Sequence, residues 1–244
     1  MTTIDLRTEL QTARREVRVA NVAVDQLPAD LADAYRFAFT LMAADDVAAW
    51  KIGGANPWSQ AAFGNSDPFF GALSRNELLI DTPSVDLSTL YKPLAEPEIM
   101  LEIGSLPDDE GRATFSRIGL GVEIPASVLP DDAKQQLAGQ IIDRAGAGLI
   151  WVGNIQPFNE KMLEGLTVRF GRISEDLTEG GSHNVVNGAA GAVQAFLRIA
   201  KALGAPLAQG QWIATAGLVK AIRVSPGDTL VVETPDAHLE IPFI

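Results

Sequence analysis

The sequence has no cysteine and only two histidines, His183 and His238. The missing thiols exclude disulfide bonds, thiolate metal sites and cysteine nucleophiles, and they leave the cellular compartment undecided. Two histidines are too few for a multi-histidine metal site. Catalytic or metal-binding groups in this chain must therefore come largely from its other polar residues.

Basic residues are also in short supply. Nineteen Lys and Arg face 31 Asp and Glu, which gives a formal net charge of −12. This sign argues against nucleic acid or an anionic membrane as a partner, because both bind clustered cations. A bound divalent cation would offset part of the negative charge.

Long hydrophobic runs are missing as well. No apolar stretch approaches the roughly 20 residues needed to cross a bilayer, and residues 1–18 are charged and amphipathic, without the apolar core of a signal peptide. We therefore expect a cytoplasmic protein. Its 244 residues, 47% of them hydrophobic, suffice for a sizeable core in one large domain or in a large domain with a small cap.

The first part of the chain has helical periodicity. Residues 3–18 place Ile4, Leu10 and Val17 at helical spacing. A second helix is predicted over residues 31–44, because Pro28 and Asp30 before it suit a helix start. We therefore expect residues 1–45 to form an N-terminal helical segment.

Beyond residue 45 the chain changes character, since short apolar runs alternate with Gly, Pro and Asp. These runs predict strands. They cover residues 47–54, 77–81, 96–104, 118–127, 148–153, 166–173, 211–219 and 228–234. Helices are predicted over residues 130–147 and 189–204, the second stopping at Gly204, and a tight turn over residues 224–230. Residues 46–244 should thus form one β-rich body of an α+β protein. Irregular alternation and the lack of a glycine fingerprint argue against a dinucleotide-binding fold.

Charged residues enter one of these predicted strands, in the stretch "LAEPEIMLEIG" at residues 94–104. Glu96 and Glu98 alternate, so a strand would put both carboxylates on one face. Two such charges repel unless they share a proton or a cation. The alternative is that both lie on the wet face of a half-exposed sheet. Glu102 precedes a polar loop and is interpreted as a solvated strand end.

A third carboxylate, Glu123, stands in "GLGVEIPAS", a short apolar strand with no other charge. Together the three glutamates would be an all-oxygen ligand set, with no Cys or His nearby. Such a set favours a hard cation, Mg²⁺ or Mn²⁺, with water or substrate in the remaining positions.

One lysine also stands in an apolar run. Lys51, in "DVAAWKIGG", either extends to the surface or is held in an apolar pocket with a lowered pKa. Gly53 and Gly54 after it would let the backbone approach a ligand closely.

Several stretches occur together in a familiar order: "WKIGGANPWSQAAFGNSDPFFGAL", "LAEPEIMLEIG", "GVEIPAS" and "GQWIATAGLVKAIRVSPGDTLVV". This order resembles the 2-keto-4-pentenoate hydratase group, which includes 4-oxalocrotonate decarboxylases and belongs to the fumarylacetoacetate hydrolase superfamily. The resemblance covers nearly the whole chain. It implies a mixed, strongly curved β-sheet roll with an N-terminal helical part, and a homo-oligomer.

The resemblance also implies roles for individual residues. It makes Glu96, Glu98 and Glu123 the ligands of a divalent metal, and Lys51 the active-site lysine. The remaining expected substrate-binding positions are Gly53, Asp67, Phe69 and Lys220. Asp67 and Phe69 match a loop that borders the pocket, although an Asp-Pro turn and a core aromatic explain them equally well.

The activity that the resemblance implies is metal-dependent hydration of a 2-oxo-alkenoate, of the 2-hydroxypenta-2,4-dienoate type, to a 4-hydroxy-2-oxo acid. The nearest alternative is decarboxylation of an oxalocrotonate-type 2-oxo diacid, and a third is an inactive metal-binding relative. The hydrolase branch of the superfamily uses a His–Glu pair between the metal carboxylates. No histidine lies between Glu98 and Glu123, which disfavours C–C bond hydrolysis, and His183 is interpreted as a loop residue.

The chain departs from the family pattern at three places. Residues 124–127 read Ile-Pro-Ala-Ser, residues 188–190 read Gly-Ala-Ala, and Val219 and Lys220 stand where Thr-Gly is expected. Lys220 could bind an extra substrate carboxylate or lie on the surface. These changes leave an altered substrate, an altered reaction and a lost activity open.

Overall fold

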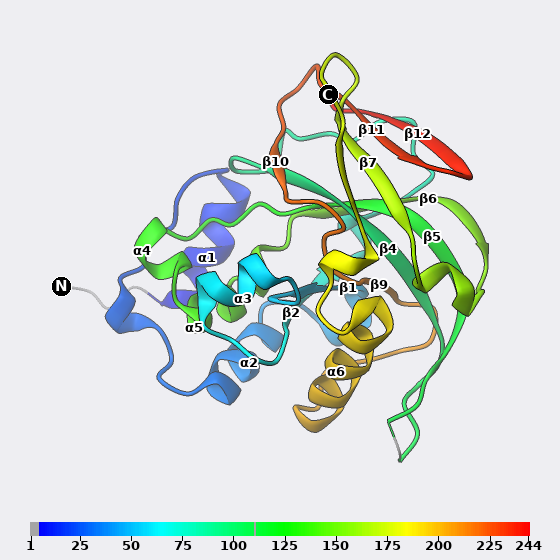
Figure 1. Ribbon diagram of the computed structural model, residues 1–244. Helices are drawn as coiled ribbons and strands as arrows, with labels where there is room; N and C mark the ends of the chain where they lie inside the picture. The colour runs from blue at the N-terminus through cyan, green and yellow to red at the C-terminus, as the bar shows by residue number, and fades with distance from the viewer. Residues whose placement is uncertain (1–4, 110) are drawn as a thin grey trace.

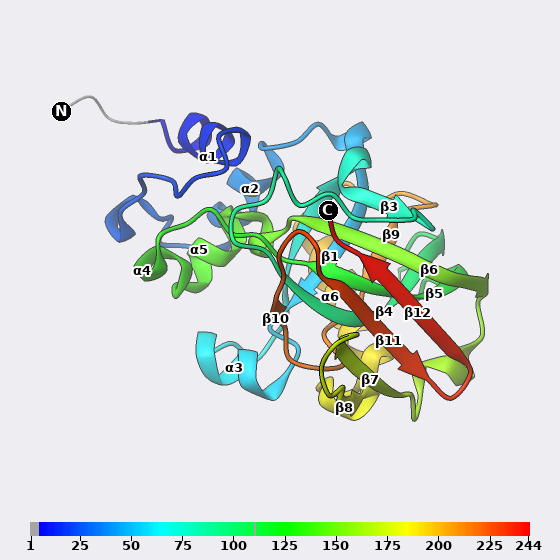
Figure 2. The ribbon, with the colours of Figure 1, turned by 90° about the horizontal axis from the view of Figure 1, so that it is seen from above.

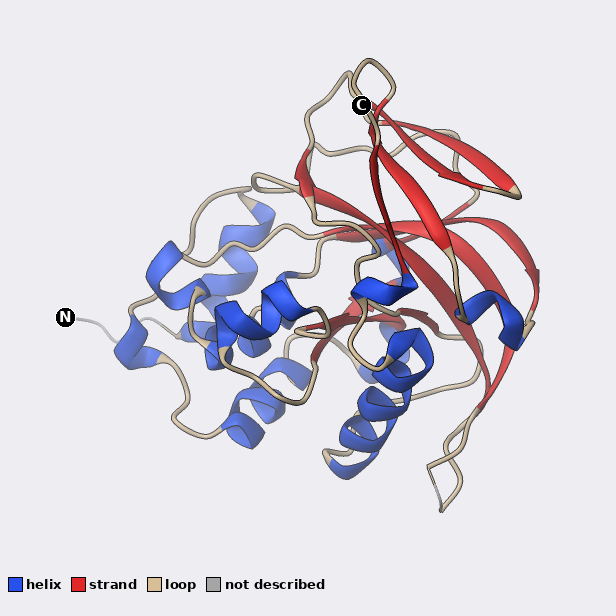
Figure 3. Ribbon diagram, viewed as in Figure 1, coloured by secondary structure: helices blue, strands red, loops and turns tan. Residues whose placement is uncertain are grey.

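The computed structural model describes residues 5–109 and 111–244. Helices gather on one side of the molecule and long strands curl around the other, as Figures 1 and 3 show. The α+β class and the curved mixed sheet expected from the sequence are confirmed. No helix of the described part is both long and apolar enough to cross a membrane.

The larger sheet has eight strands in the order β2-β1-β9-β4-β5-β6-β3, with β10 paired to β4. It is mixed, because β1 runs parallel to β9 and β3 parallel to β6 while the other neighbours are antiparallel. Its strands are β1 (Val47–Gly53), β2 (Phe69–Ser74), β3 (Leu78–Ile80), β4 (Leu94–Ser105), β5 (Thr114–Ile124), β6 (Leu149–Pro157), β9 (Trp212–Ala214) and β10 (Ile222–Arg223).

A second sheet of four strands has the order β12-β11-β7-β8. Its strands are β7 (Thr167–Arg172), β8 (Thr178–Gly181), β11 (Thr229–Thr234) and β12 (Ala237–Pro242). Seen from above in Figure 2, the β11–β12 hairpin crosses over the long strands of the first sheet. Each predicted strand matches an observed one, but the run at residues 211–219 is extended only at Trp212–Ala214. Strands β2, β8, β10 and β12 were not predicted.

The two helices predicted near the N-terminus are present as α1 (Leu6–Arg15) and α2 (Leu31–Phe39), but both are shorter than predicted: α1 ends at Arg15 and α2 at Phe39, against predicted ends at residues 18 and 44. Helix α1 is capped by the Asp5 side chain, and α2 by Asp30, which accepts from the backbone amides two and three residues on. Residues 3 and 4 of the first predicted helix lie outside the described residues. Helix α6 (Gly188–Ala202) ends before Gly204, whose φ of +67° suits glycine. Helix α3 (Pro57–Phe63) was not predicted.

The helix predicted over residues 130–147 is wrong as a single element. The chain instead forms α4 (Asp131–Lys134), α5 (Leu137–Ile142) and a 3₁₀ turn, η4 (Arg144–Gly146), in which all three residues have positive φ. Tertiary contacts made by Arg144 and Ala145, described below, override the local helical preference.

The core lies between the curled sheet and α6. Phe196 of α6 packs on Trp50 of β1 and Phe70 of β2, with ring centroids 5.8 and 5.0 Å apart. On the other side, Arg14 of α1 donates to the Ala147 carbonyl and to the buried Asp143 carboxylate. The η4 turn that follows Asp143 packs on β1 and β2, and its Ala145 carbonyl accepts a hydrogen bond from the buried Lys51.

Candidate metal and lysine site

Three glutamates meet on neighbouring strands of the large sheet. In the antiparallel register of β4 and β5, Glu96 lies directly opposite Glu123, and Glu98 lies opposite Gly121. Glu96 and Glu98 share a face because they are two residues apart on β4. One carboxylate oxygen from each of the three lies within 4.8 Å of the others. The sequence expectation that two separate strands bring three carboxylates together thus agrees with the geometry.

The cluster is short of hydrogen-bond donors. Glu98 and Glu123 are almost fully buried. Glu98 Oε1 and Glu123 Oε2 accept no hydrogen bond within the described residues, whereas Glu123 Oε1 lies 2.7 Å from Lys51 Nζ. Buried polar atoms without partners are rare in folded proteins. The unpartnered oxygens of Glu98 and Glu123 are therefore free to bind a cation.

The pKa values of Glu96 and Glu98 also reflect the crowding of negative charge. Burial, together with the neighbouring Glu123, raises the pKa of Glu96 to about 8 against the opposing effect of Lys51. Burial and the other two carboxylates raise the pKa of Glu98 well above its usual range. A divalent cation among these oxygens would remove the repulsion, and an all-carboxylate donor set is the kind that Mg²⁺, Mn²⁺ and Ca²⁺ prefer. The residues present therefore fit a hard divalent ion.

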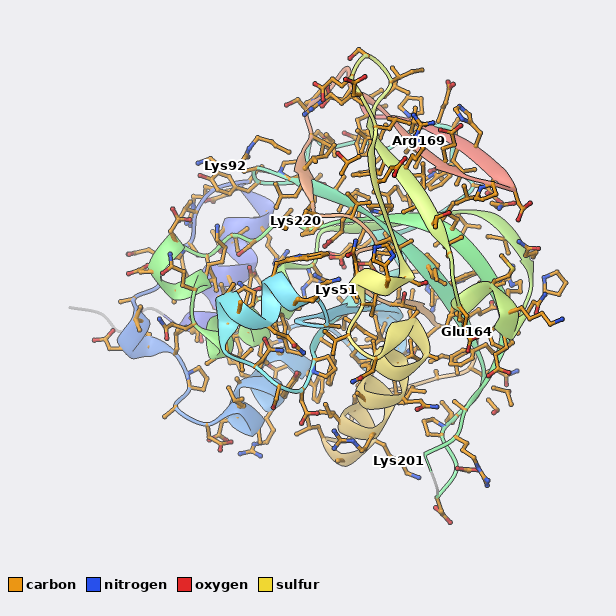
Figure 4. All side chains as sticks on the ribbon, viewed as in Figure 1. Lys51, Lys92, Glu164, Arg169, Lys201 and Lys220 are labelled. Carbon is orange, nitrogen blue, oxygen red and sulfur yellow. The ribbon has the colours of Figure 1, made fainter. Side chains whose placement is uncertain are left out.

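Lys51 of β1 reaches the same cluster through Glu123; in Figure 4 it lies near the centre of the fold. Its side chain is 6% exposed, and Nζ lies 2.7 Å from Glu123 Oε1. It also donates to the Ala145 carbonyl at 2.9 Å. Burial lowers the pKa of Lys51, but Glu123, Glu96 and Glu98 outweigh it and raise the pKa above its ordinary value. Lys51 is therefore in a pocket, as one sequence-based alternative held, but without the lowered pKa.

The loop after β9 packs against Glu96 and Glu98. The Ala216 amide donates to Glu98 Oε2 at 2.9 Å, and the Leu218 amide donates to the Pro97 carbonyl. A Cβ on Gly217 would lie 2.3 Å from Glu96 Oε2. Asn56 fixes this loop by donating to the Gly217 carbonyl at 2.8 Å.

A second support holds the lysine. Residues 144–146 all have positive φ, between 55° and 69°, which is uncommon for residues with a side chain. This turn aims the Ala145 carbonyl at Lys51. Arg144 anchors it with two parallel hydrogen bonds to Glu77, at 2.7 and 2.8 Å, and a third to the Ala72 carbonyl. Gly71 lets the turn approach β2, because a Cβ there would lie 1.7 Å from the Arg144 carbonyl oxygen.

The cluster lies at the base of a cavity of about 920 Å³. Lys51 and Glu96 line the cavity, which opens between α3, the loop after β9 and the α4–α5 region. Its wall includes Gly53, Gly54, Trp58, Phe63, Phe69, Tyr91, Lys92, Pro125, Lys134, Lys220 and Arg223. This volume suits a small organic ligand.

The structure separates the other predicted site residues into two groups. Gly53, Phe69 and Lys220 line the cavity. Asp67 does not line it; its side chain is 64% exposed and pairs with Arg198 at 3.0 Å. His183 is an exposed residue of a short 3₁₀ turn and does not line this cavity.

The interpretation of Glu102 as a solvated strand end is wrong. Its side chain is only 11% exposed, and Arg117 on β5 holds it in a two-pronged ion pair that Ser116 extends. Arg117 Nε donates to Oε2 at 2.7 Å. The cross-strand register, which pairs positions 102 and 117, was not visible in the sequence of one strand.

Sequence reasoning missed the supporting residues. Nothing in their residue types marks Asn56, Glu77 and Arg144 as part of the site. Their hydrogen-bond partners are far away in the sequence. A weak signal existed in "RAGAG" at residues 144–148, where Gly146 falls in the last turn of the predicted helix and Gly148 directly follows it. Asn56 before Pro57 is typical of a helix N-cap, and its side-chain contact with Gly217 could be found only in three dimensions.

Comparisons with known proteins agree with this geometry. No family model matches the chain. The 2-keto-4-pentenoate hydratase of Paraburkholderia xenovorans is 27% identical over 186 residues, which cover 73% of this chain and 68% of that protein. A 2-keto-4-pentenoate hydratase 3 of Pseudomonas putida matches with the same figures.

The fold is similar to that of solved proteins with related names. A 4-oxalocrotonate decarboxylase from Pseudomonas putida G7, complexed with calcium and acetate, superposes with a TM-score of 0.86 at 20% identity, covering 98% of this chain and 96% of that one. A second structure of that enzyme, with magnesium and adipate, gives a TM-score of 0.85 at 21% identity over the same shares of the two chains. The chain is thus similar in sequence to two 2-keto-4-pentenoate hydratases and similar in fold to 4-oxalocrotonate decarboxylase, in agreement with the resemblance noted in its sequence.

Proposed function

We propose that the chain is a metal-dependent lyase that adds water to a 2-oxo-alkenoate, of the 2-hydroxypenta-2,4-dienoate type, to give a 4-hydroxy-2-oxo acid. The observation that carries this proposal is the meeting of Glu96, Glu98 and Glu123 beside Lys51 at the base of a ligand-sized cavity. The hydratase names of the sequence relatives support it.

Glu96, Glu98 and Glu123 would hold the divalent ion, with Mg²⁺ or Mn²⁺ proposed. When bound, such an ion supplies the Lewis acidity that stabilises an enolate of a 2-oxo acid. Glu96 is the ligand that faces the cavity, so it marks the side from which the substrate would approach.

Lys51 is the group of this site best placed to move protons. Lys51 lines the cavity, and its Nζ is held from two sides by Glu123 and the Ala145 carbonyl. In the proposed hydration the dienol loses its hydroxyl proton and gains one at C5, and water then adds its oxygen at C4 and a proton at C3. Lys51 would act as general acid–base in these transfers, which is a role worth about 10²–10⁴-fold in rate.

A second function, decarboxylation of an oxalocrotonate-type 2-oxo diacid, is favoured by the fold similarity over 98% of the chain to 4-oxalocrotonate decarboxylase. Both reactions pass through a stabilised dienolate, so the same glutamates and lysine would serve either. They differ in whether a C–C bond breaks and CO₂ leaves.

The test mixes purified protein and Mg²⁺ or Mn²⁺ with 2-hydroxypenta-2,4-dienoate and, separately, with 4-oxalocrotonate. Loss of the dienol absorbance without CO₂ supports hydration, and CO₂ release from the diacid supports decarboxylation. Lys51→Met serves as the inactive control in each reaction. No turnover of either compound, with Mg²⁺ still bound, contradicts both activities and leaves a metal-binding relative that has lost catalysis.

A further inference from the structure

The η4 turn, which gives Lys51 its second hydrogen-bond acceptor, has an unfavourable backbone conformation. Arg144, Ala145 and Gly146 all have φ between 55° and 69°, and this left-handed conformation is costly for residues that carry a side chain. Such backbone persists only where the surrounding structure holds it, and it clusters at functional sites. Contacts from elsewhere in the fold must therefore keep the turn in place.

One arginine of the N-terminal helical segment holds both ends of the turn. Arg14 of α1 donates to the Asp143 carbonyl at 2.9 Å and to the Ala147 carbonyl at 2.7 Å, and these residues directly precede and follow η4. The same guanidinium contacts the Asp143 carboxylate at 2.5 Å. A guanidinium has five N–H donors in a rigid planar fork, so it can bridge several acceptors at set distances. We call these three contacts of Arg14 the Arg14 clamp.

The clamp extends to the wall of the cavity through a buried carboxylate. The Asp143 side chain is fully buried. One of its oxygens accepts from Arg14, and the other accepts from the Ser127 hydroxyl at 2.6 Å. Ser127 and Gly146 both line the cavity, as does Lys51. The N-terminal helix is thereby linked by hydrogen bonds to the part of the wall that lies beside the lysine.

The ionic network behind the turn carries no net charge. Arg14 pairs with Asp143, and Arg144 pairs with Glu77, so two positive charges face two negative ones. Opposite charges in close pairs largely cancel at a distance. The network therefore acts on Lys51 mainly through the position of the turn.

Helix α1 does not need Arg14 in order to dock. Leu10 and Ala13 are its buried residues, and burial of apolar surface is the main driving force for packing. A buried ion pair, by contrast, is a weak source of stability. The specific contribution of the clamp is therefore the geometry of η4 rather than the attachment of the helix.

The position of the Lys51 amine depends on this geometry. An ammonium group has three N–H donors, and Glu123 and the Ala145 carbonyl take two of them. Glu123 is also a proposed metal ligand, so the Ala145 carbonyl is the acceptor that Lys51 does not share with the metal site. If η4 relaxed toward ordinary helix, this carbonyl would move and Lys51 would keep Glu123 alone.

We propose that Arg14 is a positioning residue for the proposed reaction. By fixing both ends of η4 it keeps the Ala145 carbonyl on Lys51, and it thereby sets where the Lys51 amine meets the substrate. Arg14 does not line the cavity, so it acts through the turn and not on the substrate. The inference rests on the proposed function, because it takes Lys51 as the group that moves protons. It makes the N-terminal helical segment part of the machinery of the site.

A charge-neutral double substitution tests the clamp without leaving a buried charge unpaired. In Arg14→Met/Asp143→Asn, the clamp variant, the new amide can still accept from Ser127, while both contacts to the backbone carbonyls are lost. We expect turnover to fall about 10- to 100-fold, since a misplacement of about 1 Å can cost 10²-fold. KM and Mg²⁺ affinity should stay unchanged, because the carboxylates of the glutamate cluster are not altered.

A similar ion pair elsewhere in the sheet provides the matched control. Arg117 and Ser116 both donate to the Glu102 carboxylate, as Arg14 and Ser127 do to Asp143, and neither Arg117 nor Glu102 lines the cavity. Arg117→Met/Glu102→Gln should therefore leave turnover unchanged. An equal loss of turnover in this control and in the clamp variant overturns the positioning role.

Removal of Lys51 separates positioning from a general loosening of the site. If Arg14 acts through Lys51, then adding the two clamp substitutions to Lys51→Met should lower turnover no further, because the effects of coupled residues are not additive. A further 10- to 100-fold loss on top of Lys51→Met overturns the proposal, since Arg14 would then act by another route.

Acetylation of the metal-free protein gives a readout that needs no turnover. The rate at which acetic anhydride modifies Lys51 is measured by peptide mass spectrometry and divided by the rate at the exposed Lys161. We expect this ratio to rise about tenfold in the clamp variant, since a hydrogen bond to a charged group is worth about that factor. The control variant should leave the ratio unchanged, and an unchanged ratio in the clamp variant overturns the clamp.

The two readouts distinguish this inference from the proposed function. If the unaltered protein turns over neither 2-hydroxypenta-2,4-dienoate nor 4-oxalocrotonate, the proposed function fails, and the acetylation ratio alone decides whether Arg14 positions Lys51. If the unaltered protein is active and the clamp variant loses no turnover, the proposed function stands and the positioning role is overturned. Slower turnover together with faster acetylation of Lys51, both confined to the clamp variant, supports the proposal.

Discussion

Lys51 and Glu123 form a buried ion pair with 2.7 Å between Nζ and Oε1, and each side chain is at most 6% exposed. The proposed acid–base group, Lys51, therefore contacts Glu123, one of the proposed metal ligands, directly. A cation bound at Glu123 would draw on the same carboxylate that now holds Lys51. Metal binding and the position of Lys51 are thereby coupled through a single side chain.

Replacing Lys51 with methionine should separate these roles. We expect turnover to fall by about 10²–10⁴-fold, since that is the usual contribution of a general acid–base group. Mg²⁺ affinity should be retained or rise, because all three carboxylates stay in place and Glu123 is released from Lys51. Steady-state kinetics and Mg²⁺ titration of the same preparation check this, and a variant that loses metal and turnover in parallel would contradict the assigned role.

The loop after β9 should control metal affinity through one glycine. In Gly217→Ala the new Cβ would lie 2.3 Å from Glu96 Oε2, so that carboxylate must move. We expect Mg²⁺ affinity to fall about 10- to 100-fold, as for the loss of other groups that orient metal ligands. Gly171→Ala, whose nearest neighbour would be Leu177 Cδ2 at 3.3 Å, is the control for adding a methyl group in a strand. Equal Mg²⁺ affinities in the two variants would refute the steric account.

The central residues of this site could be found from the sequence because their signals are local. Alternation on one strand places Glu96 and Glu98 on one face, and an isolated charge in an apolar run singles out Lys51 and Glu123. Strand register then needs no special information: once β4 and β5 pair, Glu96 and Glu123 lie opposite each other. The resemblance in motif order supplied the metal, which spacing alone left open.

The supports of the site escaped prediction because they depend on long-range contacts. The segment at residues 130–147 has helical spacing, yet Arg144 leaves the helix to reach Glu77, 67 residues away in the sequence. Glu102 reads as a strand end until Arg117 is placed beside it by the β4–β5 register. Local propensity is a weak guide wherever a buried ion pair decides the backbone path.

That Arg144–Glu77 pair should make stability depend on acid pH. Burial raises the pKa of Glu77, but the charge and hydrogen bonds of Arg144 outweigh it, so the pKa is below its ordinary 4.5. The folded protein then binds fewer protons here than the unfolded chain. This contribution is complete above about pH 4.5 and is lost as the pH falls through the lower folded pKa.

Urea unfolding at a series of pH values tests the pair. Glu77→Gln should flatten the loss of unfolding free energy below about pH 4.5. Arg144→Met should cost about 2 kcal/mol at neutral pH by leaving a partly buried carboxylate unpaired. Glu175→Gln is the matched control, because Glu175 forms an exposed pair with Arg172 worth well under about 1 kcal/mol. An unchanged pH profile in Glu77→Gln would contradict the pKa direction.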